Sequence, residues 1–167
     1  LDVAGLVPGA HEGKGMGNQF LDDLRQADAL IHVIDVAGTT NEKGESIDPG
    51  SYDPANDIRF LEEELDMWYL RLIKKGWGVF ARKVKQESLE PDKALVSHLS
   101  GLGVTEVIIK TTRKNLELSE KLADWDDDTL KTLAVELRKV TKPMIIACNK
   151  IDVPGAVENF ARLENEF

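Results

Sequence analysis

The sequence has little cysteine, no long apolar run and a shortage of positive charge, and each shortage narrows the range of functions. Cys148 is the only cysteine among 167 residues, which excludes an intramolecular disulfide. It stands in an apolar run, so we expect a buried thiol in a reducing compartment. No apolar stretch is long enough to cross a membrane and no signal peptide is recognisable, so we predict a cytoplasmic protein without a membrane partner.

Acidic residues outnumber basic ones by 30 to 21, which gives a formal net charge of −9. A protein that holds nucleic acid mainly by neutralising phosphates needs the opposite balance, so we predict no direct sequence-specific nucleic-acid partner. A local basic patch at Arg82, Lys83 and Lys85 leaves contact with nucleic acid open. With 42% hydrophobic residues, the chain can form one globular domain with its own core.

Two continuous apolar runs, at residues 29–36 and 143–150, predict buried parallel strands with helices on both faces of the sheet. Residues 1–4 have the pattern of the end of a third strand. Helical periodicity predicts three helices between the two runs, at residues 57–75, 91–102 and 126–140. The fold class is therefore α/β.

Capping residues support the predicted helices. Asp57 is the expected N-cap of the first helix, and Gly76 follows its end. Residues 104–110 are β-branched enough for a strand, but we favour a helix capped by Thr105. The last helix is expected to turn four apolar residues inward: Leu130, Leu133, Leu137 and Val140.

The first chemical motif is "DVAG", residues 2–5, at the expected end of a strand. An aspartate there can hold Mg²⁺ through water, and a glycine three residues later can bring its backbone N–H close to a terminal phosphate. We therefore predict that Asp2 is the magnesium residue and that Gly5 is a nucleotide-binding residue of a D-x-x-G phosphate sensor.

The second motif is "NKID", which directly follows the apolar run "MIIAC". A carboxylate at this strand end can accept both hydrogen bonds from the N1 and N2 edge of guanine, while a lysine stem lies along the base. We predict Asn149, Lys150 and Asp152 as nucleotide-binding residues. For Asp152 alone, a helix cap before Pro154 is the ordinary alternative. Both motifs in this order, each after an apolar strand, together predict a guanine-nucleotide site.

The glycine-rich pattern G-x-x-x-G-x-G-x-G-N-x-F, at residues 9–20, is more discriminating than either short motif. With "DPANDIRFLEEELDMW" and "KPMIIACNKID", it resembles the Obg family of translation-factor-related GTPases, and within it the YchF-like branch of archaea and eukaryotes. The resemblance implies a P-loop NTPase-type parallel sheet with a helical insertion, GTP and GDP as ligands, and Mg²⁺ as cofactor. It also implies a mobile switch II that contains Gly9, Gly13, Gly15, Gly17 and Asn18.

The phosphate-binding pattern G-x-x-x-x-G-K-[ST] does not occur, so we expect a partial sheet that lacks the P-loop strand. The chain begins with Leu1 rather than Met, and we interpret it as an internal fragment of a GTPase that is inactive alone. Three parts are expected: residues 1–56 with switch II, residues 57–140 as helical insertion and return helix, and residues 141–167 with the base-recognition motif.

Departures from the GTPase pattern concern catalysis. Leu6 stands where many small GTPases have a water-orienting glutamine, which predicts slow hydrolysis. The catalytic residue is unknown, with His11 as a weak candidate. Asp152, in place of the residues that accompany ATP preference in parts of this branch, favours GTP.

The resemblance further implies a ribosome-associated or translation-factor partner that is signalled by switch II. The alternative is a helical protein-interaction module on a nucleotide-sensing scaffold with little hydrolysis of its own. Its partner surface would consist of four aromatic residues, although such residues are more often a small core: Trp68, Tyr69, Trp77 and Phe80.

Overall fold

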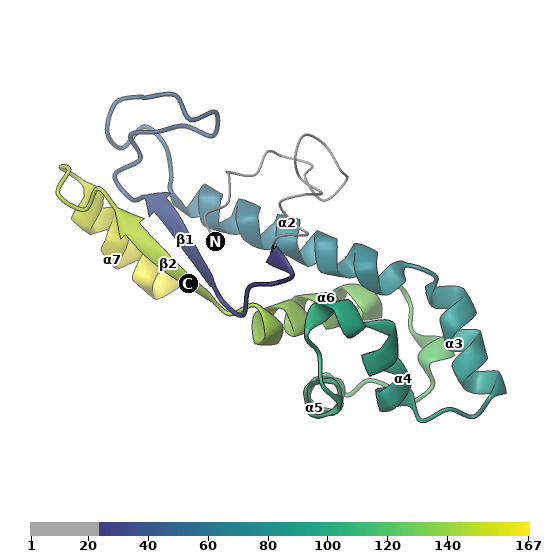
Figure 1. The fold of residues 1–167 in the computed structure, drawn as a ribbon. Helices are drawn as coiled ribbons and strands as arrows, with labels where there is room; N and C mark the ends of the chain where they lie inside the picture. Colours follow the sequence, from purple (N-terminus) through teal and green to yellow (C-terminus); the bar gives the residue numbers. More distant parts are fainter. Residues whose placement is uncertain (1–23) are drawn as a thin grey trace. The chain divides into compact units, whose positions relative to one another are not determined.

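The computed structural model describes residues 24–167. Four expectations fall on residues 1–23 and therefore lie outside the described residues: the third strand, the D-x-x-G motif, the glycine-rich switch II and His11. Within the described part, the protein combines helices with a parallel two-stranded sheet, which confirms the predicted α/β class (Figure 1).

The sheet consists of β1, Leu30–Asp35, and β2, Met144–Asn149, which pair in parallel. Both strands lie where the apolar runs predict them, within one residue at each end. Their register pairs Leu30 with Met144 and Asp35 with Asn149, so the carboxyl ends of the two strands are neighbours.

Only one face of this sheet is buried among the described residues, whereas the apolar runs predicted burial on both faces. The buried face packs with the start of α2, Ala55–Lys74, and with α7, Ala156–Glu166. On the other face three apolar side chains remain exposed: Ile31 at 72%, Val33 at 61% and Ile145 at 67%.

The chain divides into two compact units. One contains residues 30–63 and 144–167, and thus the sheet; the described part of the other contains residues 24–29 and 64–143, and thus most of the helices. Helix α2 begins in the first unit and ends in the second. The domain boundaries predicted at residues 56/57 and 140/141 stay predictions.

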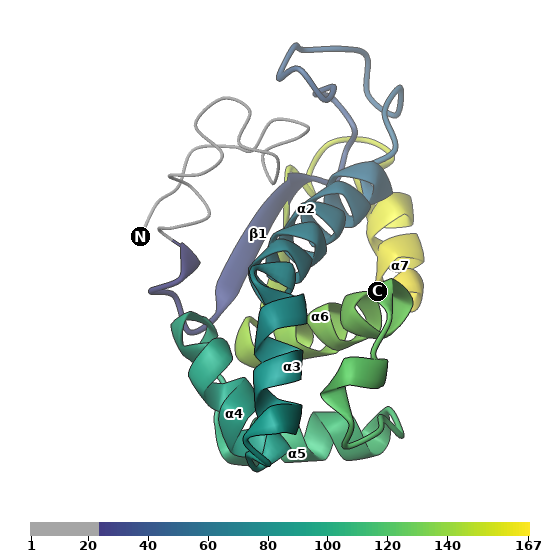
Figure 2. The ribbon, with the colours of Figure 1, turned by 90° about the vertical axis from the view of Figure 1, so that its right-hand side faces the viewer.

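Beyond α2, the helical unit contains short helices joined by tight turns, and α3, α4 and α5 lie beside one another in Figure 2. Their bounds are Trp77–Gln86 for α3, Pro91–His98 for α4, Glu106–Asn115 for α5 and Asp127–Thr141 for α6, with 3-10 turns at Ser100–Leu102 and Leu122–Asp124. Inside the unit, Arg113 of α5 donates to the buried Asp92 of α4, with 2.7 Å between Nε and Oδ1.

Local capping confirms several predicted helix starts. Helix α4 begins with Pro91, and the Glu90 side chain accepts hydrogen bonds from two backbone N–H groups in the first turn of the helix. Thr105 Oγ1 accepts from the backbone N–H of Ile108 at 3.3 Å, so the ambiguous segment is a helix with the predicted cap. Asp126 caps α6 through the N–H of Thr129 at 2.8 Å.

Two details of the helix predictions are wrong. Asp57 is not the N-cap of α2, because the helix begins at Ala55 and the Asp53 carboxylate accepts the N–H of Ala55 at 3.0 Å. Asp57 instead accepts from the Tyr52 hydroxyl at 2.8 Å. Val140 is 53% exposed near the end of α6, where the inward stripe has ended.

The aromatic residues of the helical unit pack within it. Trp68 and Tyr69 are buried, and their rings meet edge to face. Trp77 stacks on Trp125 with 5.6 Å between ring centroids. Phe80 stacks on His98 of α4 at 4.1 Å. These contacts indicate a small core in this unit. No helix within residues 24–167 is long and apolar enough to span a membrane.

Candidate functional site

The described part of the candidate site lies at the carboxyl ends of β1 and β2. The parallel register sets Asp35 beside Asn149, and the pairing continues with a hydrogen bond from Val36 N to Asn149 O at 3.1 Å. Residues 36–54, which follow β1, therefore start next to the segment that follows β2. In open parallel sheets, ligands bind outside this end of the strands.

The "NKID" segment turns sharply after β2. Lys150 has a φ of 61°, in the left-handed region, which is unusual for a side chain of this size. Its backbone N–H donates to Asn149 Oδ1 at 2.9 Å, and its carbonyl accepts from Val153 N at 3.1 Å. Asp152 is exposed, and its carboxylate forms no hydrogen bond or ion pair with any residue in the described range.

The Lys150 ammonium is bound by the end of β1 and the loop that follows. Nζ lies 2.9 Å from Asp35 Oδ2, 2.7 Å from Thr39 Oγ1 and 3.1 Å from Thr40 Oγ1. An ammonium group has three N–H donors, and all three are used here. The lysine side chain is nevertheless 40% exposed, so part of its aliphatic stem is accessible to a ligand.

Asp35 is the acceptor at the centre of this network. Its Oδ2 also accepts from Thr39 N at 3.0 Å, Thr39 Oγ1 at 2.6 Å and Thr40 Oγ1 at 2.8 Å, and its Oδ1 accepts from Ala37 N at 3.2 Å. Desolvation on burial raises the pKa of Asp35, but the hydrogen bonds from Thr39, Lys150 and Thr40 outweigh it and lower the pKa to about 2. Asp35 is therefore ionised at neutral pH.

Sequence reasoning predicted Asn149, Lys150 and Asp152 as site residues but did not name Asp35, Thr39 and Thr40, which the structure brings to Lys150. The signal that could have found Asp35 was its place at the end of the first apolar run, which matches the place of "NKID" at the end of the second. The remaining predicted residues lie outside the described residues: Asp2, Gly5, Gly9, His11, Gly13, Gly15, Gly17 and Asn18. Among residues 24–167, no group of three His, Cys, Asp or Glu side chains could hold a metal ion.

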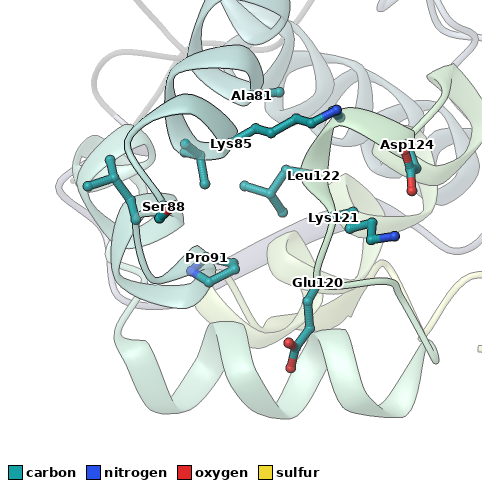
Figure 3. Close-up of a pocket in the computed structure, with 11 residues that line it drawn as sticks. Ala81, Lys85, Ser88, Pro91, Glu120, Lys121, Leu122 and Asp124 are labelled. Atoms are coloured by element: carbon teal, nitrogen blue, oxygen red, sulfur yellow. The ribbon is translucent and has the colours of Figure 1, made fainter.

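A separate cavity of about 400 Å³ lies in the helical unit (Figure 3). Its lining comes from α3, the turn before α4 and residues 120–124, with Leu122 at its centre. The cations Lys85 and Lys121 and the carboxylates Glu120 and Asp124 surround it. Of the predicted nucleotide-binding residues that the structure describes, Asn149, Lys150 and Asp152, none lines this cavity.

Comparison with known proteins finds relatives that are named GTP-binding proteins, although no protein-family model matches the chain. An uncharacterised GTP-binding protein of Methanocaldococcus jannaschii is 49% identical over all 167 residues, which span 41% of that protein. One of Schizosaccharomyces pombe is 42% identical over 98% of the chain and 39% of its own length. The chain thus spans about two fifths of these curated relatives.

A similar solved structure agrees with these sequence matches. A GTP-binding protein from Pyrococcus horikoshii has a TM-score of 0.81 and is 41% identical, with 88% of this chain and 43% of that chain covered. More distantly, a Danio rerio protein named Obg-like ATPase 1 is 30% identical over 89% of the chain and 35% of its own length. The chain is therefore a relative of the Obg-like GTP-binding proteins, and the comparisons fit the Obg/YchF-like resemblance that its motifs predict.

Proposed function

We propose that this chain is the part of a GTP-binding protein that recognises the guanine base. The observation that carries the proposal is the exposed Asp152 carboxylate, which has no partner in the described part of the chain and stands two residues after an anchored lysine. A carboxylate without internal partners is available to accept hydrogen bonds from a ligand. The relatives named as GTP-binding proteins support the same ligand class.

The donor pattern of guanine suits this carboxylate. Guanine has N1–H and N2–H donors side by side, and the two oxygens of Asp152 can accept one hydrogen bond from each. Adenine has no such pair of adjacent donors, so it cannot donate one hydrogen bond to each oxygen of the carboxylate. The partial exposure of Lys150 allows its stem to lie along the base. One more distant relative is named an ATPase, so base preference is the property to measure first.

The finer features of the function rest on the resemblance. We propose that Mg²⁺ is bound through water by Asp2, and that Gly5 contacts the terminal phosphate. The glycines of switch II would then report the presence of that phosphate to a ribosome-associated or translation-factor partner in the cytoplasm. With Leu6 in place of glutamine, we propose that hydrolysis is slow.

The sequence contains no G-x-x-x-x-G-K-[ST] pattern, and most of the affinity for a nucleoside triphosphate comes from such a phosphate cradle. We therefore propose that this chain alone has no GTPase activity and that the activity belongs to a longer protein that contains it. Experiments on the nucleotide site should use that longer protein.

The test is competition binding of GTP, ATP and XTP to the longer protein. We expect Asp152→Ala to lower GTP affinity by about 100-fold, because two charge-assisted hydrogen bonds are lost. We expect Asp152→Asn to shift the preference toward XTP, because an amide can donate to the O2 of xanthine. Glu158→Gln, at an exposed position in the first turn of α7, is the control and should change nothing. Equal affinity for GTP and ATP, or an unchanged preference in Asp152→Ala, contradicts the proposal.

A further inference from the structure

We infer that Asp35, Thr39 and Thr40 are positioning residues that hold Lys150 in place for nucleotide binding. We call these three residues the lysine clamp. The inference rests on the proposed function, because it assigns a role at the same site. None of the three residues needs to touch the nucleotide, since each acts through the lysine ammonium.

The first observation is the number of bonds to the ammonium. Each N–H donor of Lys150 has its own oxygen acceptor, at 2.9, 2.7 and 3.1 Å. A flexible lysine head on the surface normally keeps its rotamer freedom and its hydration. Here the head is fixed at the end of β1, so only the stem remains free to meet a ligand. The clamp therefore sets the direction of the stem.

The second observation is the backbone at Lys150. A φ of 61° is disfavoured for a residue with a long side chain, and such conformations persist only where the surroundings determine them. The Asn149 side chain supports this turn through the Lys150 N–H at 2.9 Å, and the clamp supports it from the other end of the residue. Backbone strain of this kind concentrates at ligand-binding sites.

The third observation is that the clamp is held together without the lysine. Thr39 donates to Asp35 through both its N–H and its hydroxyl, and Thr40 donates through its hydroxyl. The strand register fixes Asp35 directly beside Asn149. Contacts within the protein thus hold the clamp in place, and a site held in this way lowers the ordering cost of binding.

The clamp and Asp152 should differ in what they control. Asp152 is the residue proposed to accept from the base edge, so its replacement should change which base is preferred. The clamp side chains bond the Lys150 ammonium rather than a base, so their loss should weaken binding of every base that the lysine stem covers. A clamp variant is therefore expected to lower the affinity for GDP and XDP by similar factors, without changing their ratio.

The test is a double-mutant cycle in the longer protein, with GDP and XDP titrated by calorimetry. We expect Asp35→Asn to lower GDP affinity by about tenfold in the unaltered background and by less than about twofold in the Lys150→Met background. Thr39→Val removes one hydroxyl while it keeps the side-chain shape, and should act in the same direction. Asp48→Asn, exposed in the same loop, is the matched control and should leave affinity unchanged.

The outcomes separate the clamp from a merely structural role. An equal loss of affinity in both backgrounds would mean that Asp35 supports the fold rather than the lysine, and would overturn the inference. If Asp35→Asn unfolds the protein, Thr39→Val carries the same cycle, and additive effects there overturn it as well. Unchanged GDP affinity in Asp35→Asn, with guanine preferred over adenine, overturns the clamp alone. If the unaltered protein shows no preference for guanine over adenine, that result overturns the proposed function and the clamp with it.

Discussion

Arg138 of α6 and Asp66 of α2 form an ion pair with 2.7 Å between Nε and Oδ1, and a second hydrogen bond of 3.4 Å joins Nη2 to Oδ2. The residues lie 72 positions apart in sequence. Both side chains are largely buried, at 4% and 17% exposed. The pair thus joins the middle of α2 to α6 inside the helical unit.

Replacement of Asp66 tests how much this pair contributes. Asp66→Ala removes a carboxylate that bonds the buried guanidinium, so we expect the free energy of unfolding to fall by about 3 kcal/mol. The double replacement Asp66→Leu with Arg138→Met removes both charges and should lose less than the single change. Urea unfolding of the three variants measures this. Glu63→Ala, exposed on the same helix, should cost less than about 0.5 kcal/mol, and an equal cost at both positions would contradict the prediction.

A second prediction concerns His32 of β1. Its Nδ1 is buried and has no hydrogen-bond partner within the described part of the chain. Burial lowers the pKa of His32 below its ordinary value of 6.5, although the negative charges of Asp57 and Glu62 act in the opposite direction. The folded state therefore disfavours the protonated imidazole.

The sign of the pH dependence follows from this shift. The unfolded chain takes up the proton at higher pH than the folded chain, so stability is full above pH 6.5 and falls as pH drops through that value toward the lower folded pKa. Urea midpoints at about pH 7.5 and about pH 5.5 should show the loss. His32→Leu should reduce it, and an unchanged slope in that variant would show that other groups cause the pH dependence.

The sequence was sufficient for features that depend on local chemistry. The two strands are runs of β-branched residues, and hydrophobic content alone located them within one residue. Thr105 caps α5 because a hydroxyl three residues before a free N–H needs no distant partner. The placement of "NKID" at the carboxyl end of β2 follows from the same local pattern.

Features that depend on distant contacts could not be predicted. Asp35 and Lys150 lie 115 residues apart, and only the strand register brings them together. Asp57 has the residue type of a helix cap, but α2 begins two residues before it, and the Asp53 carboxylate accepts the N–H of Ala55. Periodicity also cannot state which sheet face is covered, so the exposure of Ile31 and Val33 in the described part was not foreseen.

The last prediction concerns Gly38, which precedes the clamp threonines. Its φ is 61°, and a Cβ atom added there would lie 2.2 Å from the backbone oxygen of Tyr52. Real Cβ atoms do not approach backbone oxygens so closely, and the neighbour is main chain that cannot rotate away. Gly38→Ala should therefore move the loop that carries Thr39 and Thr40.

Gly44 provides a matched control for this position. It has a φ of 77°, but a Cβ atom there would meet nothing within 4 Å. Gly44→Ala should cost about 1 kcal/mol, from the left-handed backbone alone. Gly38→Ala adds a steric clash and should cost about 3 kcal/mol in urea unfolding. Because the shifted loop would also loosen Lys150, Gly38→Ala should weaken GDP binding by the longer protein while Gly44→Ala leaves it unchanged. Equal effects of the two substitutions on stability and on binding would mean that the close approach to Tyr52 has no role in holding the lysine.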